Sequence, residues 1–294
     1  MMPHPDCVPC LMKRVLFQAR LLDNGMEMAA VKAGLKTYAA GIDGADNSAR
    51  LATQVHRAAY DAMGVEDPYL ELKIRADRVA AEYVGQAEDL VRSSDDRFSA
   101  AVRVSIIGNV MDFGSGIALD DPDDFGKVFS DLLAQGIGSD QTAELRKCVD
   151  AADSVIYIFD NCGEDQFDRI LIREIGDMGK RVIGVARGAP ILNDVTVCDA
   201  KRIGLDADLD ELMTTNAFAI GIDMDRIGDD LRKEMSGNAV IIAKGMANYE
   251  SLSDERIPIP VAYLLRAKCI PVAGSLGVSV GTNVVRVCDQ SRHQ

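Results

Sequence analysis

The chain lacks the features that mark membrane and secreted proteins. Although 48% of its 294 residues are hydrophobic, no apolar run approaches the roughly 18 residues that a membrane-spanning helix needs. The first seven residues do not show the basic-then-apolar order of a signal peptide. These absences predict a cytoplasmic protein with no membrane partner.

Basic residues are in the minority. The chain has 32 Lys and Arg against 46 Asp and Glu, which gives a net charge of −14. A surface this negative repels the phosphate backbone, so we expect no nucleic-acid partner. A small phosphorylated ligand is still allowed, because the local potential in a cleft can oppose the net charge of the protein.

Histidine is scarce, and the cysteines do not form a disulfide pattern. The three His suggest no Ser-His-Asp arrangement, and the seven Cys at scattered spacings predict reduced thiols. Cys7 and Cys10 form a CxxC ahead of a helix, a spacing that can bind a metal or host redox exchange. Because no second CxxC completes a four-ligand zinc site, Cys7 and Cys10 are candidates for a second metal or redox site only.

The order of helical and strand patterns predicts an N-terminal all-helical region joined to an α/β domain. Helical patterns cover 9–22, 26–40, a segment from the Asn47-Ser48 cap to Met63, and 68–92. After residue 98, strand patterns at 102–107, 154–159, 181–186, 217–221, 240–243 and 269–273 alternate with helical patterns at 123–135, 165–178, 192–203, 225–235 and 260–267. Such alternation predicts a Rossmann-like, mostly parallel sheet in 99–294, with 1–98 as a helical lid over its pocket.

Two acid-bearing turns carry the chemistry. Asp160 and Asn161 directly follow one apolar strand, and Asp194 lies in the turn after the next strand. Ligands of open α/β sheets bind beyond the carboxyl ends of the strands, where these oxygens can converge on a hard cation. Each turn alone is explained by turn and helix-cap chemistry, but the two together favour a divalent metal site.

Further polar residues follow other predicted strands. Asn109 and Asp112 lie in a third polar loop, in which Asn109 could bind substrate or orient a water. Lys244 ends the strand 240–243, Gly245 lets the backbone approach a ligand, and a helix starting near Asn248 would offer N–H groups to phosphate. A P-loop and a Gly-x-Gly-x-x-Gly turn are both absent, which disfavours ATP cradling and NAD binding.

Together these motifs resemble the damage-control phosphatase family, once classed as domain of unknown function 89. The matching pieces are Asp160-Asn161-x-Gly-Glu164, Arg187-Gly-x-Pro-x-x-Asn193-Asp194, Gly108-Asn109-x-x-Asp112, Lys244-Gly-x-x-Asn248-Tyr249-Glu250 and the CxxC of the prokaryotic branch. The resemblance implies a divalent cation (Mn²⁺, Mg²⁺, Co²⁺ or Ni²⁺) held by Asp160, Asn161 and Asp194, with Asp160 and Asp194 catalytic. It also implies hydrolysis of phosphate esters of small, often damaged metabolites.

The candidate substrate-binding residues are taken from the same motifs and from one further lysine: Asn109, Asp112, Glu164, Arg187, Lys244, Gly245, Asn248 and Lys268. A second Asp two places after Asp160, as in haloacid-dehalogenase-type phosphatases, is replaced by Cys162. This favours an attacking water over an aspartyl-phosphate. The alternative functions are a nucleotide- or SAM-binding protein, such as a methyltransferase, in the same crevice, and a redox or interaction module built on the CxxC.

Overall fold

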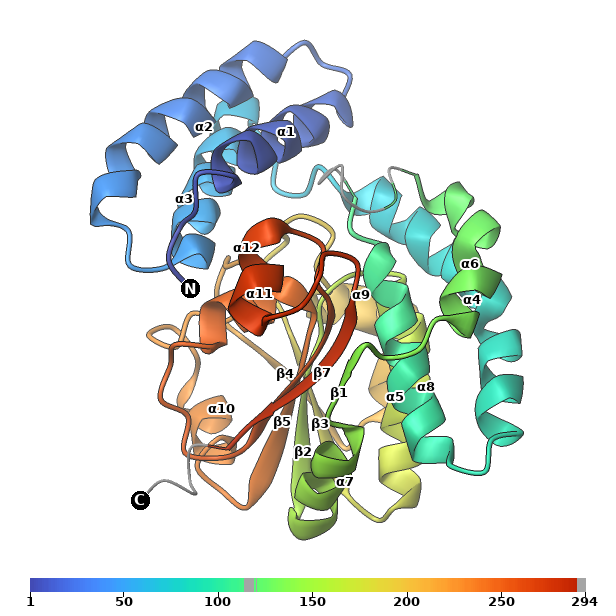
Figure 1. Cartoon of the computed structure of the whole chain (residues 1–294). Helices are drawn as coiled ribbons and strands as arrows, with labels where there is room; N and C mark the ends of the chain where they lie inside the picture. Colours follow the sequence, from blue (N-terminus) through green and yellow to red (C-terminus); the bar gives the residue numbers. More distant parts are fainter. Residues whose placement is uncertain (114–118, 120, 290–294) are drawn as a thin grey trace.

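The structure, a computed structural model, describes residues 1–113, 119 and 121–289 (Figure 1). Its centre is a seven-stranded sheet in the order β1-β7-β6-β5-β2-β3-β4. All neighbouring strands are parallel except β6 and β7, which are antiparallel. The strands are β1 (Ser139–Asp140), β2 (Ser154–Ile158), β3 (Arg181–Ala186), β4 (Glu211–Thr214), β5 (Ala239–Lys244), β6 (Val261–Arg266) and β7 (Asn283–Cys288). The predicted Rossmann-like, mostly parallel α/β fold is confirmed.

Five helices lie in the first 107 residues, before helices and strands begin to alternate. They are α1 (Cys7–Arg20), α2 (Glu27–Gly41), α3 (Ser48–Met63), α4 (Leu70–Arg92) and α5 (Arg97–Ile107). The predicted ends of α3 are confirmed, since Asn47 Oδ1 accepts from the Ala49 and Arg50 N–H groups and Gly64 is left-handed at φ 66°. Helices α1 to α3 form a separate group above one end of the sheet (Figure 1).

The later helices alternate with strands. They are α6 (Phe125–Ala134), α7 (Thr142–Ala151), α8 (Glu164–Asp177), α9 (Val197–Arg202), α10 (Asp229–Glu234), α11 (Gly245–Leu252) and α12 (Ile270–Leu276). Short 3₁₀ turns lie at Ile42–Gly44, Gly108–Val110, Pro122–Asp124 and Leu205–Asp208. None of the helices in the described part of the chain combines the length and apolar character that crossing a membrane requires.

The two faces of the sheet pack into two different cores because side chains alternate along each strand. On β2, Val155 and Tyr157 belong to the core shared with α5, α7 and α8. Ile156 and Ile158 belong to the core shared with α10, α11 and α12. All five residues of β2 are buried, as expected for a strand covered on both faces.

The predicted strand at 102–107 is wrong, because these residues form the second half of helix α5. The segment is mostly apolar and is completely buried except for Arg103, and a short buried run of this kind does not reveal whether its period is two or 3.6. The helix start was visible in Asp96, whose side chain accepts a hydrogen bond from the Ser99 N–H at 3.1 Å. Asn109 and Asp112 therefore follow a helix, not a strand.

Three other predictions in the C-terminal half are also wrong. Residues 217–221 form no strand, and β4 lies earlier, at Glu211–Thr214. The predicted helix 260–267 is strand β6, and the predicted strand 269–273 is the start of α12. The signal for α12 was Pro271, since proline is favoured in the first turn of a helix.

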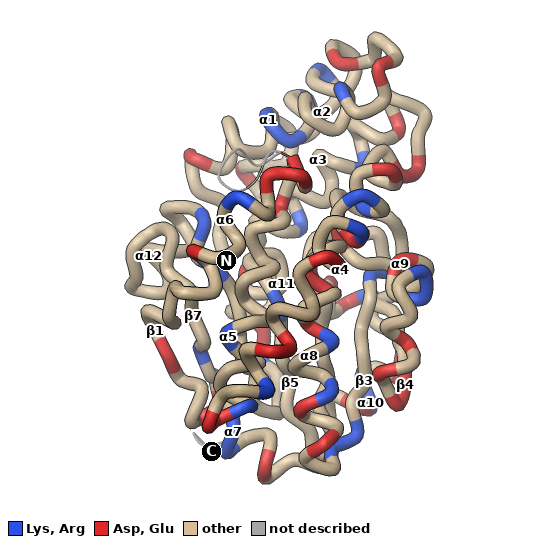
Figure 2. Tube along the Cα trace, turned by 90° about the vertical axis from the view of Figure 1, so that its right-hand side faces the viewer, with Lys and Arg blue, Asp and Glu red and all other residues tan. Residues whose placement is uncertain are grey.

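Acidic and basic side chains are interspersed along the whole trace (Figure 2). Many of them pair: Arg173, for example, bridges Glu88 and Asp208 at 2.9 Å each. Exposed pairs of this kind contribute little to stability, so the folding free energy comes mainly from the two cores.

Candidate active site

The two acid-bearing turns are joined by backbone hydrogen bonds. The Val195 N–H donates to the Asp160 carbonyl at 2.8 Å, and the Cys162 N–H donates to the Asn193 carbonyl at 2.8 Å. Asn161 and Asp194 thereby face each other as an antiparallel bridge. The turns after β2 and β3 thus form one unit at the carboxyl ends of neighbouring strands.

Two amides hold two carboxylates behind this bridge. Asn109 Nδ2 donates to Asp160 Oδ2 at 3.1 Å and to Glu164 Oε2 at 2.8 Å. Asn161 Nδ2 donates to the same two oxygens at 2.7 and 3.0 Å. Asn109 is fixed in turn, because its Oδ1 accepts the Arg266 N–H at 3.1 Å. Because the Asn161 N–H groups point at the two carboxylates, its Oδ1 points away from them.

Arg187 is the cation nearest to the pair of aspartates. Its Nε donates to Asp194 Oδ2 at 2.7 Å, and its Nη2 lies 3.8 Å from Asp160 Oδ1. The side chain is only 1% exposed, and neither Nη1 nor Nη2 has a hydrogen-bond partner among the described residues. Arg187 therefore brings positive charge to both carboxylates from behind the cavity.

Lys244 lies below this layer and is fully buried. Its ammonium donates to Glu164 Oε1 and to Asp168 Oδ1, both at 2.6 Å, and to the Ser105 carbonyl at 2.9 Å. Burial lowers the pKa of Lys244, but the two carboxylates more than offset this, so the pKa is raised. All three N–H donors are used within the protein, which makes Lys244 a support for Glu164.

Gly245 and Asn248, from the first turn of α11, shape the back of the site. Gly245 has φ +72°, and a Cβ there would lie 1.8 Å from Asp160 Oδ2. Only glycine therefore fits beside this carboxylate. Asn248 Nδ2 donates to the Phe159 carbonyl at 3.1 Å and to the Lys244 carbonyl at 2.6 Å, which ties α11 to the end of β2.

A second polar cluster centres on Asp112. Its carboxylate binds Lys268 Nζ at 2.7 Å and Arg14 Nη2 at 2.8 Å. Burial alone would raise its pKa, but Arg14 and Lys268 lower the pKa of Asp112 to about 2. Lys268 Nζ also donates to the Asn109 carbonyl at 2.7 Å. Two of the three N–H groups of Lys268 thus donate hydrogen bonds within the protein, and the third is available to a ligand.

Excess negative charge marks the aspartate pair. Burial, together with the carboxylates of Glu164 and Asp194, raises the pKa of Asp160 well above its usual value. Burial also raises the pKa of Asp194, although Arg187 partly opposes this. The local cations therefore do not balance the carboxylates, and a bound cation would do so.

A cavity of about 560 Å³ opens in front of these residues. Five of the predicted site residues line it: Asp112, Asp160, Asn161, Asp194 and Lys268. Asn109, Glu164, Arg187, Lys244, Gly245 and Asn248 do not line it and lie behind the aspartates. The structure thus separates the predicted residues into a layer facing the cavity and a layer that supports it.

Cys7 and Cys10 lie in the first turn of α1 and also line the cavity, as does Cys269. Burial raises the pKa of Cys7 above its ordinary value and that of Cys269 to about 11, so these two thiols are protonated at neutral pH. Protonated thiols are poor nucleophiles and poor metal ligands. A second metal or redox role for Cys7 and Cys10 stays a hypothesis.

The oxygens facing the cavity fit a hard divalent cation. Within the described residues, Asn161 Oδ1 and Asp194 Oδ1 accept no hydrogen bond, and Asp160 Oδ1 has only the 3.8 Å approach of Arg187. One amide and two carboxylate oxygens are the donor types that Mg²⁺ or Mn²⁺ prefer, with water completing the coordination. The three residues named by the sequence are therefore suited to hold such an ion.

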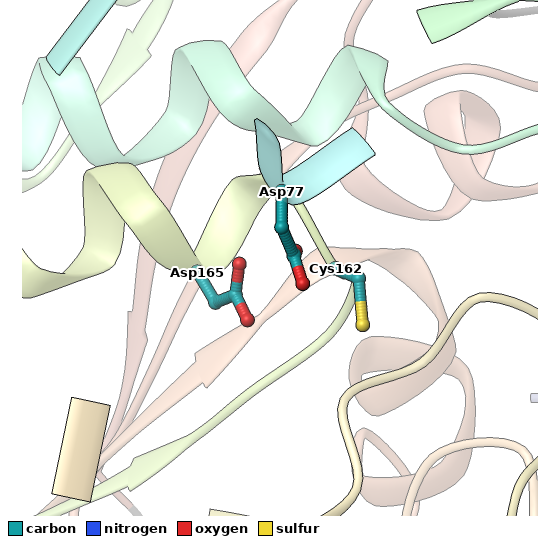
Figure 3. Close-up of side chains that lie close together, drawn as sticks. All are labelled: Asp77, Cys162 and Asp165. Carbon is teal, nitrogen blue, oxygen red and sulfur yellow. The ribbon is translucent and has the colours of Figure 1, made fainter. Parts of the chain in front are cut away.

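A different buried group, Asp77, Cys162 and Asp165, also offers three ligand atoms within 4.8 Å of one another and could hold a metal (Figure 3). Its carboxylates are partly satisfied: the Gly163 N–H donates to both and Arg202 binds Asp77 at 2.7 Å, whereas Asp165 Oδ2 has no hydrogen-bond partner among the described residues. Burial, together with neighbouring carboxylates, raises the pKa of Asp165 and of Cys162 well above their usual values. None of the three lines the cavity.

Sequence reasoning missed several members of the site. Arg14 comes from α1, 98 residues before Asp112, and nothing in its local sequence marks it. Asp168 was detectable in principle, because it follows Glu164 by four residues in α8 and shares one helix face with it.

Comparison with known proteins shows which class of protein the chain belongs to. The family model of the damage-control phosphatase ARMT1-like domain matches residues 3–284. A damage-control phosphatase of Archaeoglobus fulgidus is 39% identical over 287 residues, which cover 97% of this chain and 99% of that protein. A damage-control phosphatase of Pyrococcus horikoshii is 34% identical over 229 residues, 76% of each protein. The class is that of the phosphatases.

A solved structure extends the relation to three dimensions. The crystal structure of a DUF89 family protein from Pyrococcus horikoshii superposes with a TM-score of 0.82 at 27% identity, over 97% of this chain and 98% of that one. The chain belongs to the damage-control phosphatase family. The resemblance drawn from the motifs is confirmed.

Proposed function

We propose that the protein is a divalent-metal-dependent phosphatase that hydrolyses phosphate monoesters of small metabolites, with a role in metabolite damage control. The observation that carries the proposal is the set of unpaired oxygens of Asp160, Asn161 and Asp194 at the floor of the cavity. The phosphatases of Archaeoglobus fulgidus and Pyrococcus horikoshii support the reaction class.

The residues that line the cavity would bind the cation and the phosphate group. Asp160, Asn161 and Asp194 would hold the cation, which when bound stabilises negative charge on phosphate oxygens. Lys268 would donate its remaining N–H to a phosphate oxygen, and the N–H groups of the first turn of α11, which reaches the cavity at Met246, would serve the others. Water would attack, and we infer no aspartyl-phosphate.

The supporting layer would position the aspartates. Lys244 would neutralise Glu164 and Asp168, and Glu164 would fix the two amides that orient Asp160. We assign Lys244 this positioning role in place of the phosphate contact that the sequence suggested. Groups that orient metal ligands through hydrogen bonds strongly affect metal affinity. We therefore expect substitution of Lys244 to weaken cation binding strongly.

A nucleotide- or SAM-binding function in the same crevice is the weaker alternative. The described turn after β2 is acidic and contains a single glycine, Gly163, in place of the glycine-rich turn that binds a dinucleotide. Equilibrium titration with SAM in the absence of metal separates the two functions, and the phosphatase proposal expects no binding.

The decisive experiment is phosphatase activity after removal of metal with a chelator. We expect hydrolysis of p-nitrophenyl phosphate to return with at least one of Mn²⁺, Mg²⁺, Co²⁺ and Ni²⁺. Asp160→Asn and Asp194→Asn keep the side-chain volume but remove a charge, and each should lower the activity more than about 100-fold.

Asp165→Asn is the matched control, because it makes the same change in the other buried acidic group. It should retain metal-dependent activity. If Asp165→Asn loses the activity and the two cavity variants keep it, the cation site is assigned to the wrong group. If no cation restores hydrolysis of any phosphate monoester, the proposed function is wrong.

A further inference from the structure

Arg14 brings a guanidinium from the N-terminal helices into the cavity. The residue lies in α1, which belongs to the group α1 to α3 above one end of the sheet (Figure 1). Its side chain is 12% exposed and lines the cavity, where it is paired with Asp112. Arg14 therefore reaches from a separate group of helices to the cavity that also carries the proposed cation ligands.

Several N–H donors of Arg14 are not used within the protein. Its Nη2 lies 2.8 Å from Asp112 Oδ1 and donates to Asp112 Oδ2 at 3.1 Å. Its Nε and Nη1 donate to no group among the described residues. A guanidinium has N–H donors on all three nitrogens, so those on Nε and Nη1 are available to a ligand in the cavity.

Arg14 and Lys268 share one carboxylate oxygen. Asp112 Oδ2 accepts from Lys268 Nζ at 2.7 Å and from Arg14 Nη2 at 3.1 Å. Because both nitrogens bond to the same atom, a single phosphate group can span them. The pair is also close to the proposed cation site, since Lys268 donates to the Asn109 carbonyl and the Asn109 amide donates to Asp160.

The two cations exceed the charge of the carboxylate that they share. Lys268 Nζ already lies 2.7 Å from Asp112, and Arg14 adds a second positive charge. Glu250 lines the same cavity, but no hydrogen bond or ion pair joins its carboxyl to Arg14 or Lys268. In a chain of net charge −14, a local excess of positive charge favours the binding of an anion at this point of the cavity.

We propose that Arg14 is a further phosphate-binding residue, which donates from Nε or Nη1 to the phosphate group that Lys268 also binds. This inference rests on the proposed function, because it uses the same phosphate position beside the cation site. Arginine suits this role because its N–H donors have fixed directions that match the oxygens of a phosphate. The phosphate would then join α1 to the segment after β6, and the helical group would supply one side of the site.

The test is calorimetric titration of methylphosphonate, a non-hydrolysable analogue of a phosphate ester, into the full-length, Mn²⁺-loaded protein. Arg14→Met should raise the Kd about tenfold or more, as expected for the loss of a hydrogen bond between charged groups. Lys13→Met is the matched control, because Lys13 is the neighbouring cation of α1 and also lines the cavity. Lys13 is exposed and has no ion pair among the described residues, so its Kd should change less than about twofold.

A charge-matched variant separates phosphate binding from the neutralisation of Asp112. Arg14→Met combined with Asp112→Asn removes one positive and one negative charge, so the net charge of the cluster stays that of the wild type. This double variant should still bind methylphosphonate about tenfold or more weakly than the wild type and than Asp112→Asn alone. Its Mn²⁺ affinity should change less than about threefold, since neither residue is a proposed cation ligand.

The outcomes separate the inference from the proposed function. A double variant that binds methylphosphonate as tightly as the wild type overturns the inference, because Arg14 then only neutralises Asp112. An equal loss in Lys13→Met, or a loss of Mn²⁺ affinity that accounts for the weaker binding, overturns it as well. The predicted weakening in a protein that hydrolyses no phosphate monoester with any cation upholds Arg14 as a phosphate ligand and overturns the phosphatase proposal.

Discussion

Replacing Gly245 by alanine adds one methyl group next to Asp160 and so tests the proposed cation site. The new Cβ would lie 1.8 Å from Asp160 Oδ2, whereas ordinary contacts begin at 3.4 Å, so the carboxylate or the backbone must move by about 1.6 Å. Metal–oxygen distances tolerate deviations of only about 0.2 Å. We therefore expect Gly245→Ala to weaken cation binding more than about 100-fold and to lower kcat/KM by a similar factor.

The same substitution also strains the backbone, so it needs a matched control. Gly64 has nearly the same conformation, φ +66° against +72°, but a Cβ there meets nothing within 4 Å. Gly64→Ala should lose about 1 kcal/mol of stability from the left-handed backbone alone and keep full cation affinity. Gly245→Ala should lose about 2–3 kcal/mol, because the hydrogen bonds to Asp160 are also disturbed.

Calorimetric titration of Mn²⁺ into chelator-treated protein measures the affinity, and urea unfolding measures the stability. Unchanged Mn²⁺ affinity in Gly245→Ala would refute the assignment of Asp160 as a ligand. An equal loss of affinity in Gly64→Ala would show that backbone strain, and not the contact with the carboxylate, is responsible.

Three further perturbations follow from the structure. Lys244→Met leaves two buried carboxylates without their cation and should cost about 3–5 kcal/mol in urea unfolding, whereas Lys127→Met, in an exposed ion pair, should have far less effect. The folded pKa of Glu250 is raised from 4.5 to about 7, so its ionisation costs the folded state stability as the pH rises above about 4.5. Glu250→Gln should therefore gain about 3 kcal/mol over the wild type at pH 8 and almost nothing at pH 4, and an equal gain at both values contradicts this pKa. Substituting Cys7 and Cys10 together by Ser should leave p-nitrophenyl phosphate turnover within about twofold, and its loss would favour a metal or redox role for the thiols.

The sequence predicts the acid-bearing turns well because their structure is local. The strands before Asp160 and Arg187 are uninterrupted apolar runs, and each ends where polar residues begin. Parallel neighbours with matching registers, Ile158 opposite Val185, then bring the two turns together without any further information.

The sequence does not predict which polar residues face the cavity. Lys244 and Lys268 are both predicted to bind substrate, yet one is enclosed by Glu164 and Asp168 and the other lines the cavity. Their environments depend on residues 76 to 159 positions away, and no local pattern encodes such contacts. Helix α5 was misread for a related reason, since burial on all sides removes the polar face that would show its period.

The chain order of the site has a consequence for biosynthesis. The cavity collects residues from Asp6, just before α1, to Val280, after α12, and β5 enters the sheet between β2 and β6. Contacts over such long separations form late in folding. A growing chain therefore has no complete cavity until it has been synthesised beyond Val280. The proposed cation would bind to the finished fold and would shift its equilibrium further towards the native state.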